Sequence, residues 1–394
     1  MPHYKYLIVG GGMTADAAVN GIRESDPDGP IGLIGAEQNA PYNRPPLSKG
    51  LWKGDAPDSI WRGTDKQNVT LHLGRQAQSL DAPKKTVTDD QGNVYAFEKL
   101  LLATGATPRR LSFDDGSIIY YRTVEDYRNL RALTGQGQRF AVIGGGFIGW
   151  EMAAALAMNG KEVVMLFPGE AIGDHVYPID LARFLNGFYL QKGVKVVSGS
   201  EVVGLEKTAQ GTKVKTQTQG AFLVDGIVAG IGVTPNVELA QSAGLKVDNG
   251  IVVDEFLRTS HPDIYAAGDV ANFHNPALAM RLRVEHEDNA NTMGRAAGMA
   301  LAGKASRYHH LPFFYSDLFD LGYEAVGELN PRLETFADWK EPYREGVVYY
   351  LREGRVRGVL LWNVFGQVDA ARLLIAEPGP FTATDLKGRL PKPQ

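Results

Sequence analysis

The sequence predicts an α/β protein with two doubly wound parallel sheets and a smaller C-terminal α+β domain that holds an antiparallel sheet. Three observations predict this class. A strand, glycine turn, helix and strand follow one another from Tyr6, and the same pattern returns at Phe140. From His309 onward the pattern changes to a hairpin followed by one helix. Because parallel strands need helical crossovers, the repeated pattern indicates two parallel sheets, and the last region indicates a separate domain.

The first strand–turn–helix–strand pattern extends from Tyr6 to Glu37. The apolar run Tyr6–Val9 predicts a buried strand, the glycines 10–12 predict a tight turn, and the Ala-rich stretch to Ile22 predicts a helix. A second apolar run, Ile31–Ile34, predicts the next strand, which ends at Glu37.

The following region predicts antiparallel strands. Asn68–Leu73 and Lys85–Phe97 alternate apolar and polar residues, with a turn at 90–92, and together indicate a small antiparallel meander. Lys99–Ala103 predicts a separate buried strand that ends in Thr104-Gly105.

The second pattern repeats the first. Phe140–Ile143 predicts a strand, 144–149 a glycine turn, Trp150–Met158 a helix and Glu162–Phe167 a strand. The later predicted elements are alternating strands over Val194–Val224, a buried strand over Ile227–Val233, a helix over Glu287–Ala302, a hairpin of Gly346–Arg352 and Val356–Leu361, and a helix over Val368–Ala376.

This order predicts three domains. The first is discontinuous and comprises residues 1–112 and 241–308, and the second is inserted into it as residues 113–240. The pattern change places the third domain at residues 309–394.

Composition excludes several classes of protein. The chain has 394 residues and no cysteine, which removes disulfides, thiolate metal sites, iron–sulfur ligation and any thiol that relays electrons. No histidine spacing predicts a metal site, and the net charge of −4 gives no reason to expect a nucleic-acid partner. A strand-like run begins by Tyr4 and no stretch reaches the ~18 apolar residues of a membrane span, so we expect a cytoplasmic protein.

The first glycine turn has the spacing of a dinucleotide-binding fingerprint. In Gly10-x-Gly12-x-x-Ala15, the first glycine makes the turn, the second lets a pyrophosphate reach the backbone at a helix N-terminus, and Ala15 permits close packing. Glu37, at the end of the next strand, would accept the ribose hydroxyls.

The second turn, Gly144-x-Gly146-x-x-Gly149, repeats this fingerprint, so the chain is predicted to bind two dinucleotides. Phe167 stands at the strand end where an acid is common, and Glu170 follows in the turn. Residues 167–170 include no Arg or Lys to neutralise a 2′-phosphate, which favours NAD(H) over NADP(H).

Two further turns follow buried strands. Ala103-Thr104-Gly105 is the first, and Gly268-Asp269 comes after the strand-like run at 264–267. Glycine permits close backbone approach, and a short carboxylate at a strand end can accept hydrogen bonds from ribityl hydroxyls.

With these motifs the chain resembles the pyridine nucleotide-disulfide oxidoreductase superfamily, within it the ferredoxin-reductase branch, and most closely the bacterial-type flavoproteins similar to apoptosis-inducing factor. The resemblance extends from Tyr6 to about Ala376. It is most specific at Pro41–Lys49, Leu166–Pro168, Arg283–Ala290 and Gly358–Phe365. The absence of cysteine separates this chain from the relatives that use a redox-active thiol.

The resemblance implies FAD and NAD(H) as cofactors and assigns residues to each. Those assigned to FAD are Gly10, Gly11, Gly12, Met13, Thr14, Glu37, Arg44, Lys49, Ala77, Ala103, Thr104, Gly105, Arg109, Gly268, Asp269, Glu285, His286 and Tyr315. Those assigned to NAD(H) are Gly144, Gly145, Gly146, Phe147, Ile148, Glu151, Phe167, Glu170, Gly232, Glu324 and Asn363.

Three of the residues are expected to act in catalysis. The resemblance places Lys49 beside flavin N5, paired with Glu151, because a buried Lys and a buried Glu are each costly alone. His286 precedes a predicted helix whose N-terminus would stabilise negative charge on the reduced flavin. Without the resemblance, Lys49 reads equally well as a solvated lysine, Glu151 as a plain carboxylate at a helix start, and His286 as a structural hydrogen-bonding residue.

The sequence therefore predicts an FAD-dependent NADH oxidoreductase that passes electrons singly to an external acceptor. The acceptor would be a ferredoxin, a rubredoxin, a quinone or oxygen. The alternative is an NADH-sensing flavoprotein similar to apoptosis-inducing factor, in which a stable charge-transfer complex regulates partner binding or an NADH-dependent homodimer.

Overall fold

The computed structural model describes residues 1–390, which divide into two compact units. Unit 1 comprises residues 1–43, 58–107 and 234–312. Unit 2 comprises residues 44–57, 108–233 and the described chain from Phe313 onward. The last four positions of the predicted C-terminal domain, 391–394, lie outside the described residues, and the three-domain division stays a prediction.

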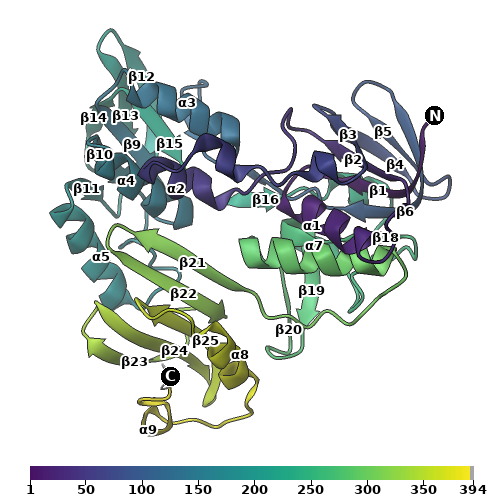
Figure 1. Cartoon of the computed structure of the whole chain (residues 1–394). Helices are drawn as coiled ribbons and strands as arrows, with labels where there is room; N and C mark the ends of the chain where they lie inside the picture. The colour runs from purple at the N-terminus through teal and green to yellow at the C-terminus, as the bar shows by residue number, and fades with distance from the viewer. Residues whose placement is uncertain (391–394) are drawn as a thin grey trace. The chain divides into compact units, whose positions relative to one another are not determined.

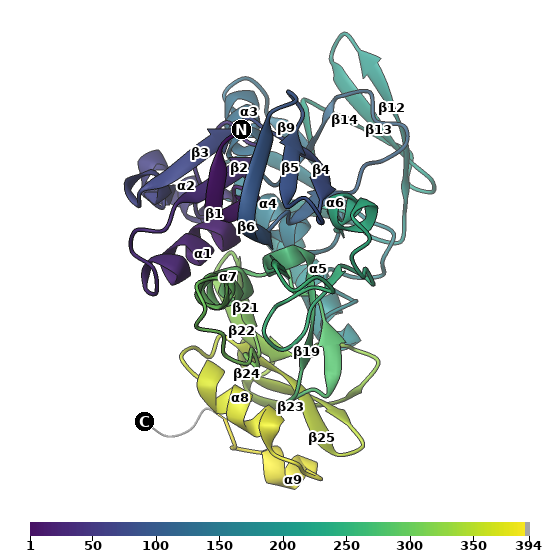
Figure 2. The same ribbon diagram turned by 90° about the vertical axis from the view of Figure 1, so that its right-hand side faces the viewer.

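Unit 1 is built on a parallel sheet in the order β3-β2-β1-β6-β18. The antiparallel strand β5 also pairs with β6, and β4 pairs with β5 (Figure 2). Its strands are β1 (His3–Val9), β2 (Ile31–Gly35), β3 (Val69–Leu73), β4 (Ala77–Asp81), β5 (Thr86–Asp89), β6 (Val94–Leu102) and β18 (Ile264–Ala266). Leu7, Leu33 and Leu101 are completely buried in its core. The predicted parallel sheet is confirmed.

Two sequence predictions in this sheet are wrong. Residues 69–73 were expected in the antiparallel meander, but β3 pairs in parallel with β2. Phe97 and Lys99 were expected in separate strands, but both belong to the continuous strand β6. Only the polar Glu98 lies between them, and no glycine or proline breaks the chain there. On one edge of β6, residues 94–96 pair with β5 and residues 100–102 pair with β18, whereas residues 96–102 pair with β1 on the other edge.

Two parallel helices of unit 1 pack unusually closely. These are α1 (Met13–Arg23) and α7 (Glu287–Leu301) (Figure 1). A Cβ on Gly294 would lie 2.5 Å from the Thr14 carbonyl oxygen, and one on Gly298 would lie 2.1 Å from that of Ala18. Because the contacts advance together along both helices, the helices run in the same direction and both N-termini lie at one end.

Unit 1 also holds short elements that connect the sheet and the helices. They are η2 (Pro57–Ile60), η3 (Thr64–Lys66), α6 (Glu238–Ser242), β17 (Ile251–Val252), η4 (Gly268–Val270), β19 (Ala271–Asn275) and β20 (Met280–Leu282). The chain passes between the units within β7 (Ala106–Pro108) and β16 (Val233–Pro235).

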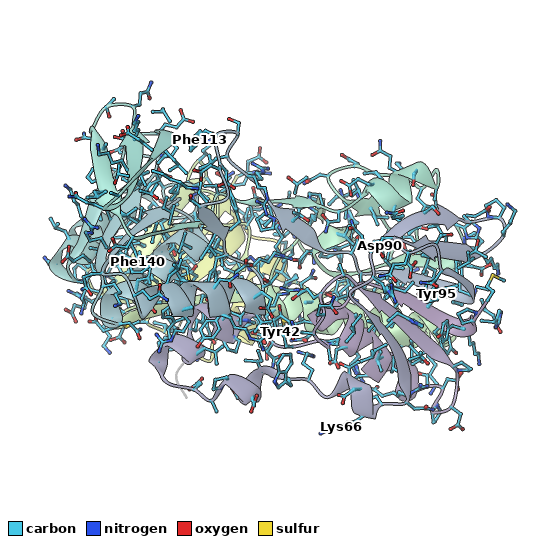
Figure 3. The ribbon with its side chains drawn as sticks, turned by 90° about the horizontal axis from the view of Figure 1, so that it is seen from above. Tyr42, Lys66, Asp90, Tyr95, Phe113 and Phe140 are labelled. Carbon is cyan, nitrogen blue, oxygen red and sulfur yellow. The ribbon has the colours of Figure 1, made fainter. Side chains whose placement is uncertain are left out.

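Unit 2 begins with a second, wholly parallel sheet in the order β11-β10-β9-β15-β8. The strands are β8 (Ile118–Tyr120), β9 (Arg139–Ile143), β10 (Glu162–Leu166), β11 (Val194–Val197) and β15 (Gly226–Ala229). The accompanying elements are η1 (Pro45–Ser48), α2 (Gly50–Lys53), α3 (Val124–Thr134), α4 (Phe147–Met158), α5 (Ile179–Gln191) and the meander β12 (Val202–Thr208), β13 (Gly211–Thr216) and β14 (Ala221–Val224). Phe140 of β9 (Figure 3) is buried against Gly226 of β15, which leaves no room for a side chain there.

The C-terminal part of unit 2 is an antiparallel sheet in the order β21-β22-β25-β24-β23. Its elements are β21 (Phe313–Leu318), β22 (Leu321–Gly327), β23 (Glu334–Glu341), β24 (Glu345–Arg352), β25 (Arg355–Trp362), α8 (Val368–Ala376) and α9 (Ala383–Leu386). The predicted hairpin and final helix are confirmed. Glu353 and Gly354 have φ values of 53° and 72°, which is the geometry of a tight two-residue turn.

Substituting a helical glycine by alanine should have opposite effects at the contact between α1 and α7 and at an open site in α5. Gly298→Ala should lower the free energy of unfolding by about 1–3 kcal/mol, because the new methyl group collides with the Ala18 backbone. Gly187→Ala in α5 meets no atom within 4 Å and should raise it by up to about 1 kcal/mol. Thermal unfolding followed by circular dichroism measures both. Equal effects of the two substitutions would contradict the close packing.

Candidate functional site: two nucleotide turns and a buried lysine–glutamate pair

The first glycine turn lies at the carboxyl edge of the unit 1 sheet. Gly10 has φ +132°, and a Cβ there would stand 2.0 Å from the Ala103 carbonyl oxygen. Gly12 is the N-cap of α1 with extended backbone, and it makes no side-chain capping bond. A glycine at this position lets an anion approach the backbone at the start of α1 closely.

The predicted ribose acceptor of unit 1 lies at the same edge. β1 and β2 end in register, Val9 opposite Ile34, so Glu37 follows a strand end next to the turn. Tyr42 (Figure 3) donates to Glu37 Oε2 at 2.5 Å and orients the carboxylate. Sequence analysis did not assign Tyr42 a role, because its contact with Glu37 depends on how the loop folds back.

Further predicted FAD residues of unit 1 gather around this turn. Thr14 Oγ1 lies 2.3 Å from where a Cβ on Gly268 would stand, so Gly268 can only be glycine, and Asp269 follows it in η4. Met13 is the first residue of α1, and the Gly11 backbone lies against Gly35. The contact between Thr14 and Gly268 also brings their chain neighbours Met13 and Asp269 to the same place.

A second loop at this edge is held by a residue that sequence analysis missed. Asn236 Nδ2 donates to the Thr104 carbonyl at 2.8 Å, and the Thr104 hydroxyl donates to the Asn236 carbonyl at 2.7 Å. The Asn236 N–H donates to the Gly105 carbonyl. Ala77 opens β4, where it pairs with Asp89 of β5.

The start of α7 carries the other predicted unit 1 residues. His286 is the N-cap residue of α7 and has extended backbone. Glu285 pairs with Arg283, whose guanidinium also donates to the Asp269 carbonyl at 3.1 Å. Because α1 and α7 are parallel, two helix N-termini with positive partial charge lie at the same end of the pair.

These features of unit 1 fit a bound dinucleotide. The turn, which has no space for a Cβ, permits the close backbone approach that a dinucleotide needs. The helix start without a side-chain cap suits the phosphates, and the oriented acid at the end of the next strand suits a ribose. Gly10 to Thr14 and Glu37 would hold the adenosine and pyrophosphate of FAD, and Asp269 would hold its ribityl chain.

The second glycine turn, in unit 2, has the same geometry. Gly144 has φ +119°, and its Cβ would lie 2.2 Å from the Gly230 carbonyl oxygen. A Cβ on Gly149 would lie 2.0 Å from the Gly144 carbonyl oxygen, which explains the third glycine. Gly146 is the N-cap of α4 and, like Gly12, makes no side-chain capping bond.

The residues predicted for NAD(H) around this turn have clear positions. The Phe167 ring lies 2.9 Å from where a Cβ on Gly145 would stand, and Ile148 packs against Gly230. Phe147 begins α4 and its ring contacts that of Phe314.

Glu170, the acid predicted for this second site, forms an ion pair. Glu170 Oε1 accepts a hydrogen bond from Arg183 Nε at 2.7 Å. Arg183 belongs to α5, thirteen positions along the chain, so the local search for basic residues at 167–170 could not find it.

Two residues predicted for different nucleotides lie together. Arg109 was assigned to FAD and Gly232 to NAD(H), yet the Arg109 N–H donates to the Gly232 carbonyl at 2.9 Å. Arg44, also assigned to FAD, belongs to unit 2 and donates to the Arg122 carbonyl at 2.9 Å.

The predicted Lys49–Glu151 pair forms inside unit 2. Lys49 Nζ lies 2.6 Å from Glu151 Oε1, and the side chains are 14% and 5% exposed. Two hydroxyl groups complete the site, because Ser48 Oγ donates to Glu151 Oε2 at 2.6 Å and Ser316 Oγ donates to Oε1 at 2.5 Å. The buried carboxylate thus has a cation and two neutral donors, which offset the cost of its burial.

A shell of aromatic residues surrounds this carboxylate. Trp150 Nε1 donates to Ser316 Oγ at 2.9 Å and so orients the hydroxyl toward Glu151. The Tyr189 hydroxyl donates to the Trp150 carbonyl at 3.0 Å. Burial, and after it the charge of Glu151, raises the pKa of Tyr189 well above its usual value, so Tyr189 remains a neutral phenol.

Of the predicted residues in and beside the C-terminal sheet, Tyr315 lies beside the buried pair, whereas Glu324 and Asn363 make hydrogen bonds within the C-terminal region. The Tyr315 ring centroid lies 5.3 Å from Lys49 Nζ, so Tyr315 is beside the buried pair. Glu324 faces Tyr315 across β21 and β22 and accepts from the Gly366 N–H at 2.9 Å. Asn363 accepts from the Gly322 N–H and donates to the Arg344 carbonyl, so both ends of its amide hold the fold together.

Comparisons with known proteins agree with this fold. Residues 4–294 match the family model described as pyridine nucleotide-disulphide oxidoreductase, and residues 337–377 match the C-terminal domain model of apoptosis-inducing factor. The chain belongs to the pyridine nucleotide-disulphide oxidoreductase family. It is a ferredoxin-reductase-like NAD(H) oxidoreductase without cysteine, and membership of the family implies FAD and NAD(H) as its cofactors.

Three relatives illustrate the similarity. The ferredoxin–NAD(+) reductase component of the anthranilate 1,2-dioxygenase system of Burkholderia cepacia is 34% identical, over 99% of this chain and 96% of its own length. The mitochondrial apoptosis-inducing factor 1 of Dictyostelium discoideum is 33% identical, over 94% and 78%. The crystal structure of the covalent putidaredoxin reductase–putidaredoxin complex matches with a TM-score of 0.90 at 31% identity, covering 96% of this chain and 94% of that one.

Two further properties of the described residues concern membranes and metal ions. Within residues 1–390, no helix has the length and apolar character needed to cross a bilayer. The same residues contain no cluster of three acidic or histidine side chains placed to bind a metal ion.

The burial of Lys49 and Glu151 predicts strong coupling between them. Lys49→Met leaves a buried carboxylate without its cation, so it should destabilise the protein more than the double variant Lys49→Met/Glu151→Gln does. A double-mutant cycle measured by chemical denaturation should give a coupling energy of about 1–3 kcal/mol.

The neighbouring exposed pair provides the control for this cycle. Lys53 and Asp317 are 44% and 43% exposed, so Lys53→Met/Asp317→Asn should show coupling below about 1 kcal/mol. Coupling at Lys49 and Glu151 no larger than at this surface pair would contradict the buried-pair description.

Proposed function

We propose that this protein is an FAD-dependent NADH oxidoreductase that delivers electrons to a ferredoxin. The observation that carries the proposal is the pair of glycine turns, one in each unit, each at the carboxyl edge of a parallel sheet. Two such turns imply two dinucleotides, and the chain has no cysteine to relay electrons between them and an acceptor. Electrons then have to leave from the flavin itself.

FAD is the proposed resident cofactor of unit 1. Bound there, it would supply the chemistry that no side chain offers, which is to accept a hydride and release electrons one at a time. The N-termini of α1 and α7 would stabilise the negative charge of the phosphates and of the reduced ring. Glu37, oriented by Tyr42, would hold the adenosine ribose.

NADH is the proposed donor and would occupy the turn at Gly144–Gly149. Lys49 and Glu151 would orient its nicotinamide end. The Glu151 carboxylate already accepts from Ser48, Lys49 and Ser316, so its position varies little when a substrate arrives. Lys49 keeps two donor hydrogens beyond the one that Glu151 accepts, and these can hold a carboxamide or a flavin atom. Such preorganised donors contribute by orientation, which can lower a barrier by several kcal/mol.

A ferredoxin is the proposed acceptor because of the relatives. One relative is the ferredoxin reductase component of a dioxygenase system, and another was crystallised with putidaredoxin. The high coverage of both chains in these matches supports a shared activity and leaves the identity of the ferredoxin to experiment.

A second candidate function follows from the match of residues 337–377 to the C-terminal domain of apoptosis-inducing factor. In that case the protein would be an NADH sensor, whose reduced form persists and changes its partner surface or its oligomeric state. The two functions differ in whether electrons leave the flavin rapidly.

The role of Lys49 and Glu151 in orientation predicts a kinetic loss. Lys49→Met and Glu151→Gln, each purified with FAD bound, should slow flavin reduction by NADH about 100-fold, because a misplaced nicotinamide loses its reactive geometry. Anaerobic stopped-flow absorbance measures the rate. Lys53→Met, which removes a neighbouring surface lysine, should reduce at the wild-type rate, and wild-type rates in all three variants would refute the assignment.

Reoxidation distinguishes the two candidate functions. Mixing the NADH-reduced protein anaerobically with an oxidised [2Fe–2S] ferredoxin should restore the oxidised flavin spectrum within seconds if the protein is a reductase. A persistent long-wavelength absorption band, together with NADH-dependent dimerisation in sedimentation, would instead support the sensor.

A further inference from the structure

The loop that follows β10 lies directly against the second glycine turn. β9 and β10 are parallel neighbours that end in register, Ile143 opposite Leu166. The Gly144 N–H donates to the Leu166 carbonyl at 2.9 Å, and the Gly173 N–H donates to the Gly145 carbonyl at 3.0 Å. In this fold, the loop after the second strand is the place where the adenosine ribose of a dinucleotide lies.

That loop carries a charged pair within unit 2. Arg183, in the second turn of α5, directs both Nε and a terminal nitrogen toward Glu170 Oε1, at 2.7 and 2.5 Å. The Arg183 and Glu170 side chains are 64% and 57% exposed. An exposed ion pair of this kind contributes little to stability, so Arg183 can exchange Glu170 for another anion at small cost.

The backbone beside the pair is firmly held. Asp174 Oδ2 accepts from the Glu170 N–H at 2.8 Å. The Asn186 side chain accepts from the Ile172 N–H at 2.9 Å and donates to the Glu170 carbonyl at 3.2 Å. Asn186 and Arg183 lie on one face of α5, so the same helix fixes the loop and supplies the cation.

The two charges of the pair suit different nucleotides. NADH ends in a ribose with free hydroxyls, which a carboxylate accepts. NADPH carries a 2′-phosphate with a charge of about −1.5 to −2 at neutral pH, which repels a carboxylate and binds a guanidinium well. The charges of Arg183 and Glu170 cancel, so the local net charge is near zero and excludes neither NADH nor NADPH.

We propose that Arg183 is a coenzyme-selectivity residue that binds the 2′-phosphate of NADPH, so that this chain uses NADPH as well as NADH, while Glu170 holds the balance toward NADH. The inference rests on the proposed function in one respect, that a pyridine nucleotide occupies the turn at Gly144–Gly149. It revises the preference for NAD(H) over NADP(H), which considered only residues 167–170.

A neighbouring histidine separates this role from general phosphate binding. His175 Cε1 lies 3.7 Å from where a Cβ on Gly146 would stand, at the turn where the pyrophosphate shared by both coenzymes would approach. His175 is therefore expected to affect NADH and NADPH alike, whereas Arg183 is expected to affect NADPH alone.

Direct binding tests the proposal without relying on catalysis. The FAD-loaded protein is titrated calorimetrically with adenosine 2′,5′-bisphosphate and with adenosine 5′-monophosphate. Arg183→Ala should weaken binding of the bisphosphate about 10-fold and change binding of the monophosphate less than about 2-fold. Glu170→Gln should strengthen binding of the bisphosphate about 3-fold or more. Arg128→Ala, which removes an exposed arginine paired with Glu125 in α3, is the matched control and should change neither.

Kinetics with the whole coenzymes complete the test. The ratio of kcat/KM for NADPH to that for NADH should fall about 10-fold in Arg183→Ala and stay constant in His175→Ala. An unchanged ratio in Arg183→Ala, or a wild-type protein that does not bind the bisphosphate, would overturn the proposal. If neither coenzyme reduces the flavin while the bisphosphate still depends on Arg183, the proposed function fails and the selectivity inference stands.

Discussion

The buried carboxylate of Glu151 is the constraint on which the candidate active site of unit 2 depends. It accepts hydrogen bonds from Ser48, Lys49 and Ser316, which come from three separate stretches of the chain. A charge that is 5% exposed is stable only while these donors are in place, so the first strand of the C-terminal sheet and the segment 44–57 are tied to the start of α4. The same bonds hold Lys49 beside Tyr315.

The two glycine turns show one physical solution used twice. In each, a positive-φ glycine lies so close to the backbone just after a neighbouring strand, β6 or β15, that no Cβ fits, and a second glycine begins a helix without a side-chain cap. The turns differ in what stands at the next strand end. In unit 1, Tyr42 orients Glu37, whereas in unit 2 Phe167 packs on Gly145 and the acid one turn later is paired with Arg183.

Local patterns made much of this predictable. Periodicity and glycine spacing predict both parallel sheets, the start of α7 after His286 and the hairpin at Glu353-Gly354. Family resemblance predicts the Lys49–Glu151 pair. What the sequence did not reveal are partners brought in from distant elements: Ser316 on Glu151, Asn236 on Thr104 and Arg183 on Glu170. The position of β3 beside β2 was missed for the same reason, because an alternating pattern does not say which strand will be its neighbour.

The central claim is that electrons pass from a pyridine nucleotide to FAD in a chain that has no thiol to store them. Anaerobic titration of the FAD-loaded protein with NADH, followed by flavin absorbance, tests this most directly. The oxidised flavin band is expected to disappear at about one NADH per FAD, because a hydride carries the two electrons that one flavin accepts. A flavin that stays oxidised, or one that needs about two equivalents before it bleaches, would contradict the claim.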